Sequence, residues 1–457
     1  MVKKEKIVII GGGLTGLSLA FFLRKNGADA VVLDRNDRPG GVIRTVSEGD
    51  FIFEKGPNTG LVASEAAALL LDELGDKLKI EYASDAVNKR YVCKKGKLLP
   101  LPMNPFQAAF TPLFSWYDKF RILLEPFRRK GTNPDGTLAE LVKRRMGKSY
   151  LDYAIDPFIL GIYAGDPGRL VPKYALPKLY NLEQSYGSFI AGAVRKFFEP
   201  KSELQKKVNR KVFSAENGLS TLISSLCGEL NEENIITSAE KLAVRPRDNG
   251  FEVSYEISGK REIIHAERVI STVGAGILPG IFSFIGDELL KPIESLEYAG
   301  VVEAAVGFNN WGGRPLDGFG ALIPFKEKRN ILGILFISSL FKGRAPENGA
   351  LFSVFLGGVR NPEVTELPDS EIIKIIEDEF RQLLNSGSAP DMINITRNNA
   401  AIPQYYEDTP KRLKAIAEIE EKYPGLILAG NIRDGIGMAN RIQQAFDLAR
   451  NIVQTGS

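Results

Sequence analysis

The chain has 457 residues, 44% hydrophobic and 25% charged, which is the composition of a folded protein with room for two or three domains. Its 59 basic and 56 acidic side chains leave a net charge of +3, too small to favour nucleic acid as a partner. A single histidine, His265, excludes a multi-histidine metal centre and argues against a Ser-His-Asp triad, and Cys93 and Cys227 form no metal or redox motif. We therefore expect reduced thiols and no metal site.

The first apolar run is short, covering only residues 7–10 after an N-terminal group of lysines. No apolar run in the chain reaches the ~18 residues that a transmembrane helix needs. We therefore expect neither a secretory leader nor a membrane span, and a cytoplasmic location.

A glycine-rich turn follows that first strand directly, with the sequence Gly11-Gly12-Gly13-Leu14-Thr15-Gly16, and a helix is expected over residues 17–25. A second strand, residues 30–33, ends in Asp34, which lies 18 residues past Gly16. Strand, glycine turn and helix together place a pyrophosphate at a helix N-terminus, and a carboxylate at this spacing meets the adenosine ribose. The sequence thus predicts a bound dinucleotide; the alternative is a glycine turn without a ligand.

The middle of the chain alternates between helical and strand patterns. We expect a helix over 62–75, a hairpin of 90–93 with 97–102, mostly helical structure over 105–200, a polar loop over 201–211, strands between 235 and 273, further strands over 301–308, 331–337 and 351–356, and a helix over 369–384. His265 falls on a strand, in a position that faces solvent.

A second strand–glycine–helix element closes the chain. A strand over 426–429 is followed by Gly430-Asn431, then by Gly435-Ile436-Gly437, with a helix from about Gly437. The positive end of that helix would stabilise an anion on a reduced flavin. A nicotinamide enzyme does not need this element, so the pattern favours a flavin, although an ordinary helix entry remains the alternative.

These motifs resemble those of the protoporphyrinogen oxidase family within the flavin amine oxidase superfamily, and they follow the family order along nearly the whole chain. The most specific string is Gly161-Ile162-Tyr163-Ala164-Gly165-Asp166-Pro167. The other matches are the 11–16 turn, Arg38-x-Gly40-Gly41-x-x-Arg44, Phe53-Glu54-Lys55-Gly56-Pro57-Asn58, residues 338–346, residues 401–405, and the closing Gly430-Asn431 with Gly435-Ile436-Gly437.

The resemblance implies a mixed α/β (α+β) fold with three domains. A discontinuous FAD-binding Rossmann-like domain would comprise residues 1–83, 205–272 and 397–457. A helical domain, able to associate with membranes, would comprise 84–204, and a sheet-containing substrate domain 273–396.

The resemblance also implies the reaction. It is the six-electron oxidation of protoporphyrinogen IX to protoporphyrin IX in haem biosynthesis, with hydride passing to a non-covalent FAD and O2 reduced to H2O2. The flavin N5 would do the chemistry, so no protein residue is expected to be catalytic in the covalent sense, and the protein would supply position, burial and electrostatics.

By this resemblance the flavin would be held by residues from both ends of the chain. The pyrophosphate and adenosine side would be bound by Gly11, Gly12, Gly13, Leu14, Thr15, Gly16, Asp34, Arg35, Gly41, Val42, Arg44 and Val244. The flavin side would be bound by Gly56, Pro57, Asn58, Thr59, Ile436, Gly437 and Met438. The family more often has glutamate at the position of Asp34, so this carboxylate is one methylene shorter.

The porphyrinogen is a large apolar ring with carboxylate arms, so its site needs apolar walls, small residues and a cation. By resemblance, Arg90 would bind a propionate, Phe341 would stack on a pyrrole, Leu322 would form a wall, and Gly161 and Gly165 would allow close approach. A surface arginine, core Phe and Leu, and a purely structural glycine turn are the alternatives.

Aromatic and basic residues are interleaved between residues 105 and 130, a pattern typical of a face that lies on a membrane. The alternative is that the aromatic side chains line the core or the substrate channel. The apolar members are Phe106, Phe110, Leu113, Phe114, Trp116, Phe120, Leu123, Leu124 and Phe127.

Three other functions stay open at this point: oxidation of coproporphyrinogen III to coproporphyrin III, another flavin amine oxidase-like activity, and a non-enzymatic porphyrin carrier. The expected partners are a porphyrinogen, O2 and a membrane surface, and no nucleic acid. A homodimer and transfer of product to a ferrochelatase are left open.

Overall fold

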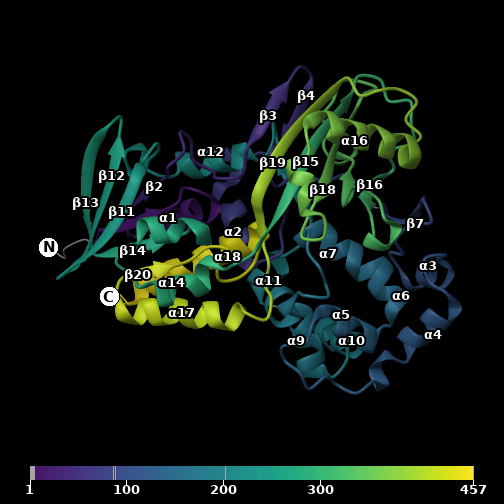
Figure 1. Ribbon diagram of the computed structural model, residues 1–457, viewed down its shortest axis with the longest axis horizontal. Helices are drawn as coiled ribbons and strands as arrows, with labels where there is room; N and C mark the ends of the chain where they lie inside the picture. Colours follow the sequence, from purple (N-terminus) through teal and green to yellow (C-terminus); the bar gives the residue numbers. More distant parts are fainter. Residues whose placement is uncertain (1–5, 86, 88, 201, 456–457) are drawn as a thin grey trace.

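The computed structural model describes residues 6–85, 87, 89–200 and 202–455. Figure 1 shows a region built on one parallel sheet, a second region with a long twisted sheet, and a helical region drawn in blue that extends away from both. The fold is mixed α/β, as the sequence predicts.

The parallel sheet brings the two ends of the chain together. Its order is β10 (Ile235–Ile236), β2 (Ala30–Leu33), β1 (Ile7–Ile10), β14 (Arg268–Ser271) and β20 (Leu426–Leu428), and all neighbours run parallel. Parallel strands are covered on both faces, which explains the continuous apolar runs of β1 and β2. β1 and β20 both pair with β14, so the expected meeting of the chain ends is confirmed.

Two apolar clusters cover the faces of this sheet. On one face the first and last long helices pack together, with the Phe22 and Phe446 rings edge to face at 5.1 Å. The elements of this face are α1 (Leu14–Lys25), α2 (Glu65–Leu74), α12 (Ser220–Gly228) and α18 (Met438–Thr455). The other face carries β11 (Glu240–Arg247), β12 (Gly250–Ile257), β13 (Lys260–Ala266), α13 (Leu278–Ile281), α14 (Asp287–Glu294) and α17 (Thr409–Lys422).

The second region is a seven-stranded sheet that draws on three separate parts of the chain. Its order is β19 (Met392–Pro403), β15 (Tyr298–Phe308), β18 (Ala350–Gly357), β17 (Gly333–Leu335), β16 (Gly318–Leu322), β7 (Lys89–Lys94) and β8 (Lys97–Pro100). Val302, Ala304 and Val306 point to one face, which α16 (Asp369–Leu384) covers. Because side chains alternate along a strand, Val301, Glu303 and Ala305 point to the opposite face.

Smaller elements join these sheets. They are β3 (Thr45–Glu48), β4 (Phe51–Glu54), β5 (Gly60–Leu61), β6 (Ile80–Tyr82), β9 (Val212–Ala215), α15 (Ile337–Leu340) and the short turns η1 (Gly75–Lys77), η4 (Glu232–Asn234), η5 (Ala275–Ile277), η6 (Phe325–Glu327) and η7 (Pro362–Glu366). β3 pairs with β4, and β9 lies between β5 and β6.

The helical region comprises α3 (Pro105–Phe110), α4 (Trp116–Leu123), η2 (Glu125–Phe127), α5 (Leu138–Arg145), α6 (Lys148–Tyr150), η3 (Leu151–Ile155, a π-helical turn), α7 (Asp156–Tyr163), α8 (Pro172–Ala175), α9 (Pro177–Tyr186), α10 (Phe189–Phe198) and α11 (Glu203–Lys207). Among the described residues, none of the helices is both long and apolar enough to cross a membrane.

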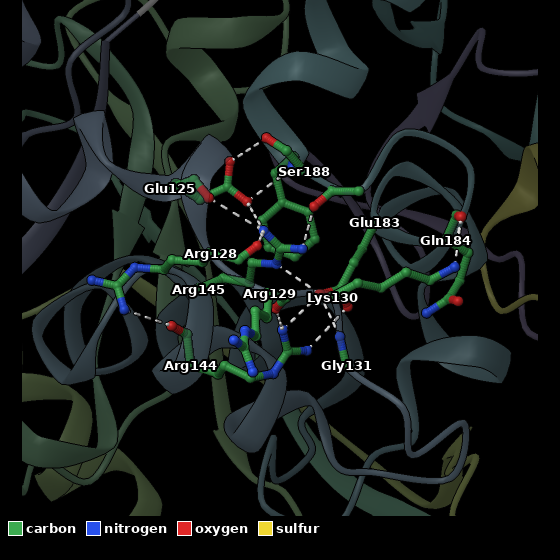
Figure 2. Close-up of polar contacts among 12 residues, drawn as sticks. Glu125, Arg128, Arg129, Lys130, Gly131, Arg144, Arg145, Glu183, Gln184 and Ser188 are labelled. Atoms are coloured by element: carbon green, nitrogen blue, oxygen red, sulfur yellow. Dashed lines mark hydrogen bonds and ion pairs between the residues drawn. The ribbon is translucent and has the colours of Figure 1, made fainter.

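A buried ionic cluster ties the helical region together (Figure 2). Arg145 is fully buried and donates from Nη1 to Glu125 Oε1 at 2.9 Å and from Nε to Glu183 Oε1 at 2.7 Å. Glu125 also accepts from Ser188 Oγ at 2.5 Å, and Glu183 from Arg144 Nη1 at 2.6 Å. The cluster therefore joins η2, α5, α9 and the start of α10, and each buried charge has its partner.

Three details differ from the sequence expectations. The polar segment 201–211 contains α11, which begins with a capping box at Ser202. The strand expected over 331–337 is only β17, because Ile337 already starts α15. The hairpin of β7 and β8, placed by the expected boundaries in the helical domain, pairs through β7 with β16 of the seven-stranded sheet. The domain boundaries themselves stay a prediction.

Candidate active site

The 11–16 turn has the geometry of a dinucleotide cradle. Gly11 has φ +106°, which favours glycine, and a Cβ on Gly16 would lie 2.0 Å from the Gly11 carbonyl oxygen. A Cβ on Gly13 would meet nothing within 4 Å, so the backbone there faces open space. Glycine at 16 thus permits close packing of helix on strand, and glycine at 13 leaves room for a ligand.

The N-terminus of α1 opens at the same place. Its N-cap is Gly13, and no described side chain caps it, so its first N–H groups are available to an anion. Gly40 N donates to Gly12 O at 2.7 Å, and Gly13 forms a bridge with Gly40, which brings the 38–44 loop against the turn. The residues present fit a pyrophosphate.

Asp34 lies directly beside this turn. Its Oδ2 accepts from Gly12 N at 2.7 Å, and its Oδ1 accepts from Asn36 N at 2.8 Å. Arg35 is exposed, and Val244 is buried on β11, which is an edge strand and so has backbone groups free of ladder partners. The roles of these residues at a ribose and an adenine stay predictions.

The 38–44 and 56–59 loops pack on each other. Arg38 holds the first loop by donating to the carbonyls of Gly41 and Ile43, each at 3.0 Å. A Cβ on Gly56 would lie 2.1 Å from Val42 O, while the Val42 side chain is 69% exposed. The contact of Val42 with a cofactor stays a prediction. Arg44 is exposed, and Thr59 is half-buried.

The closing motif reaches the same cradle through Thr272. Gly430 has φ +89°, and its Cβ would lie 2.9 Å from Thr272 O; the Thr272 hydroxyl donates to Gly11 O at 3.0 Å. Tyr405 Oη donates to Asn431 O at 2.8 Å, and Ile436 packs on the apolar cluster that contains Tyr405. Met438 begins α18 and is buried.

Asn58 connects the 56–59 loop to the seven-stranded sheet. Its Nδ2 donates to Glu303 Oε1 at 2.5 Å and to Gly56 O at 3.2 Å, and its Oδ1 accepts from Ser353 Oγ at 2.6 Å. Burial raises the pKa of Glu303 to about 8; the hydrogen bond from Asn58 acts in the opposite direction, and the negative charge of Glu54 adds to the increase. Burial also raises the pKa of Glu54 itself.

Sheet register places two of the expected substrate residues on the face that carries Glu303. Arg90 is opposite Gly320 and Val92 is opposite Leu322, which in turn is opposite Gly333. Gly333 pairs with Phe355, and Phe355 with Glu303. Paired residues share a face, so Arg90, Leu322 and Glu303 point to the same side of the sheet.

The helical region closes against this face. A Cβ on Gly161 in α7 would lie 2.6 Å from Leu322 Cδ2, so the glycine allows this contact. Arg90 is exposed, with its guanidinium 5.3 Å from the centre of the Phe319 ring. Arg90 and Leu322 thus share one sheet face, where Gly161 contacts Leu322 from the facing helix and the Arg90 side chain is exposed.

Gly165 and Phe341 have other neighbours. A Cβ on Gly165 would lie 2.6 Å from Gln404 Oε1, so this glycine accommodates a neighbouring side chain. Phe341 is 2% exposed and lines a cavity of about 240 Å³ together with Arg344 and the 343–346 turn. Arg90, Gly161 and Leu322 do not line that cavity, and the expected contact of Phe341 with a pyrrole stays a prediction.

The sequence reasoning missed Glu303, Ser353 and Thr272. One signal was present: Glu303 is the single charged residue in the otherwise apolar strand Val301–Phe308. Buried carboxyl groups are rare without a partner, so such an interruption marks a site.

The family model for flavin containing amine oxidoreductases matches residues 14–451, which is nearly the whole chain. This chain belongs to the flavin containing amine oxidoreductase family. It is therefore an oxidoreductase with a flavin cofactor, and the glycine cradle above fits that cofactor.

Individual relatives show which members of this family the chain is similar to. The chain is 30% identical to protoporphyrinogen oxidase 2 of Arabidopsis thaliana, over 96% of this chain and 92% of the relative. It is 27% identical to coproporphyrinogen III oxidase of Bacillus subtilis, over 96% of both chains. A crystal structure from Exiguobacterium sp. 255-15, provisionally named a protoporphyrinogen oxidase, has TM-score 0.81 at 20% identity and covers both chains fully. The expected resemblance and fold are confirmed.

Proposed function

We propose that this flavoenzyme oxidises protoporphyrinogen IX to protoporphyrin IX with FAD as cofactor and O2 as electron acceptor. The observation that carries the proposal is the single sheet face shared by Arg90, Leu322 and Glu303, with Asn58 joining that face to the flavin-side loop. Three successive two-electron oxidations of one porphyrinogen remove six hydrogens. Three O2 molecules accept these hydrogens and form three H2O2.

FAD, rather than a smaller flavin, accounts for the whole cradle. The α1 N-terminus and the Gly12–Asp34 contact form a dinucleotide site that a mononucleotide would leave half empty. Non-covalent binding is supported by the placement of the candidate histidine and cysteine attachment groups. His265 is exposed on β13, and Cys93 is buried among the apolar residues under α16, on the opposite face from Arg90. Cys227, on α12, packs against the apolar cluster of the parallel sheet.

The protein residues in this proposal bind and orient, because the bound flavin supplies the two-electron acceptor. Arg90 holds a propionate at the exposed end, and Leu322 forms an apolar wall. Gly161 keeps α7 close to that wall. Burial of the ring excludes water from the reacting carbon.

The experiment is anaerobic mixing of the purified yellow protein with protoporphyrinogen. Bleaching of the flavin, followed by its return with H2O2 when air is admitted, supports the proposal. Heat release should yield FAD. A protein that binds porphyrin without flavin or bleaching would instead be a carrier, and oxidation of simple amines would indicate an amine oxidase.

Coproporphyrinogen III is the second candidate substrate. Its support is the relative in Bacillus subtilis and the exposed Lys89, which lies next to Arg90. Its four carboxylates need more cations than the two of protoporphyrinogen, and Lys89 is already paired with Asp317 Oδ2 at 2.6 Å. Steady-state rates on both substrates, followed by porphyrin fluorescence, decide between them.

A membrane surface is the proposed source and destination of the apolar ring. Of the nine apolar residues noted between 105 and 130, only Leu113 and Phe114 are buried, so the core alternative fails for the other seven. The exposed ones are Phe106, Phe110, Trp116, Phe120, Leu123, Leu124 and Phe127, and Phe197 and Phe198 of α10 are exposed too. Exposed aromatics beside lysines and arginines suit a lipid interface. Co-sedimentation with anionic vesicles should fall when Phe110 and Phe127 are both replaced by serine.

A further inference from the structure

Glu303 is an unusual residue for its position in the sheet. On its face of β15, Ala305 packs with Phe51 and Phe53 of β4, and Val301 packs with Leu160 of α7. Glu303 lies between these two apolar groups and is 3% exposed. It therefore lies between β4 and α7, and its burial is costly because one hydrogen bond, from Asn58, replaces its contacts with water.

The contacts of Glu303 fix the orientation of one amide. A backbone carbonyl can only accept, so the Gly56 O contact identifies Nδ2 of Asn58, and the same Nδ2 donates to Glu303 Oε1 at 2.5 Å. Ser353 Oγ donates to the other end of the amide at 2.6 Å. Asn58 is thus held from three sides, at the edge of the loop assigned to the flavin.

The surroundings of Glu303 favour its uncharged form. Within the described residues no cation forms an ion pair with it, and no hydrogen bond reaches its second oxygen, Oε2. The charged group that acts on it is Glu54 on β4, which is negative. The elements packed around β15 carry both uncharged and charged side chains. The uncharged ones are Ser353 and Phe355 on β18 and Asn394, Thr396 and Asn398 on β19. The charged ones are Glu363 and Glu366 on η7 and Asp156 on α7, which pairs with Arg360.

We propose that Glu303 is a positioning residue: as an uncharged carboxylic acid it fixes the Asn58 amide at the edge of the cofactor site, and its ionisation places a negative charge beside that site. This rests on the proposed assignment of residues 56–59 to the flavin. The proton leaves to solvent when pH rises, and no other group need change. Oxidation is then slower at alkaline pH because electron density arriving nearby is repelled by that charge.

The first test is a pH titration of the visible absorbance of the purified, flavin-loaded protein. The wild type should show a one-proton transition near pH 8, and Glu303→Gln should lack it, because glutamine keeps an acceptor for Asn58 but cannot ionise. Glu379→Gln is the matched control: Glu379 is a buried carboxyl on α16, across the sheet, paired with Arg329 at 2.6 Å. It should leave the transition in place. Identical titrations of wild type and Glu303→Gln would overturn the proposal.

The second test separates orientation from charge. Glu303→Leu removes the acceptor and should lower kcat about tenfold with KM unchanged, and Glu303→Gln should restore most of that loss at pH 7. If Glu303→Leu does not fold, Ser353→Ala replaces it: it frees Asn58 Oδ1 without touching the carboxyl, so kcat should fall while the pH transition remains. Unchanged kcat in whichever of these two variants folds would overturn the positioning role. A protein that never carries flavin would overturn the proposed function instead.

Discussion

Replacing Glu303 by glutamine should make the folded protein less sensitive to alkaline pH. An exposed glutamate in the unfolded chain titrates near 4.5, whereas burial raises the pKa of Glu303 in the folded state to about 8. The folded state therefore holds a proton that the unfolded state releases.

The sign follows from comparing the two states over the pH range. Below pH 4.5 both states are protonated, and the carboxyl contributes no pH-dependent free energy. Between pH 4.5 and about 8 only the unfolded state ionises, so the stability of the folded protein falls as pH rises. Above about pH 8 both states are ionised, and the loss is complete.

The magnitude follows from the same two pKa values. They differ by about 3.5, and each unit corresponds to 1.36 kcal/mol, so the full loss is about 5 kcal/mol. For a chain of this length, that free energy corresponds to roughly 5–10 °C in melting temperature. The wild type should lose this amount between pH 4.5 and 9 beyond the loss shown by Glu303→Gln.

The assay is thermal unfolding of both proteins, loaded with flavin, at half-unit steps of pH. Glutamine has its own burial cost, which does not change with pH, so the difference in slope is the quantity to compare. Two melting curves that fall in parallel from pH 5 to 9 would refute the reasoning, because they would mean that Glu303 titrates as it does in the unfolded chain. The Glu379→Gln control should keep the wild-type slope, because Arg329 keeps Glu379 paired.

Three further substitutions test the cradle, the substrate face and the ionic cluster. Gly16→Ala puts a methyl group 2.0 Å from Gly11 O, so the turn must open and the protein should purify without flavin, as its absorbance at 450 nm will show. Arg90→Ala should raise KM for the porphyrinogen about tenfold through loss of a charge-assisted contact while flavin content stays constant; an unaltered KM would remove Arg90 from the site. Glu125→Ala leaves the buried Arg145 without one of its two carboxylates and should cost about 3–5 kcal/mol, measured as faster proteolysis within residues 105–200.

Each of these substitutions has a control variant at another position. Gly228→Ala adds a methyl group that meets nothing within 4 Å and should retain flavin. Lys89→Ala removes an exposed cation whose partner is Asp317 and should leave KM within about twofold. Lys148→Ala breaks an exposed pair with Asp152 and should change stability by less than about 1 kcal/mol.

The parts of the fold that the sequence predicted well are those set by local pattern. The apolar run, glycine turn and helix at residues 7–25 are contiguous, so their geometry depends on neighbours in sequence. The helix 369–384 was placed correctly because its apolar residues recur at helical spacing. The segment 331–337 was misjudged because a short apolar run does not distinguish a three-residue strand from the helix that follows it.

The candidate site was predictable only in part, because its members meet through long-range pairing. Arg90 and Leu322 were named from motifs, yet their common face follows from the pairing of β7 with β16, more than 200 residues apart in the chain. Phe341 was named with them; it lines a cavity together with Arg344, and its contact with the substrate stays a prediction. A motif gives residue identity, whereas register decides which side chains share a surface.

The same register explains why Glu303 can link the two halves of the proposed site. Its strand pairs with β18, which carries Ser353, and β18 leads through β17 to β16 and Leu322. Asn58 reaches Glu303 from the 56–59 loop, and Gly56 of that loop packs against Val42 of the cradle. A shift of β15 by one residue would turn Glu303 under α16 and leave Asn58 Nδ2 with only the Gly56 carbonyl. The carboxyl therefore reports whether sheet and cradle are aligned: its pH transition should remain in variants at Ser353 and Gly56, which leave the carboxyl itself intact, but its midpoint should shift.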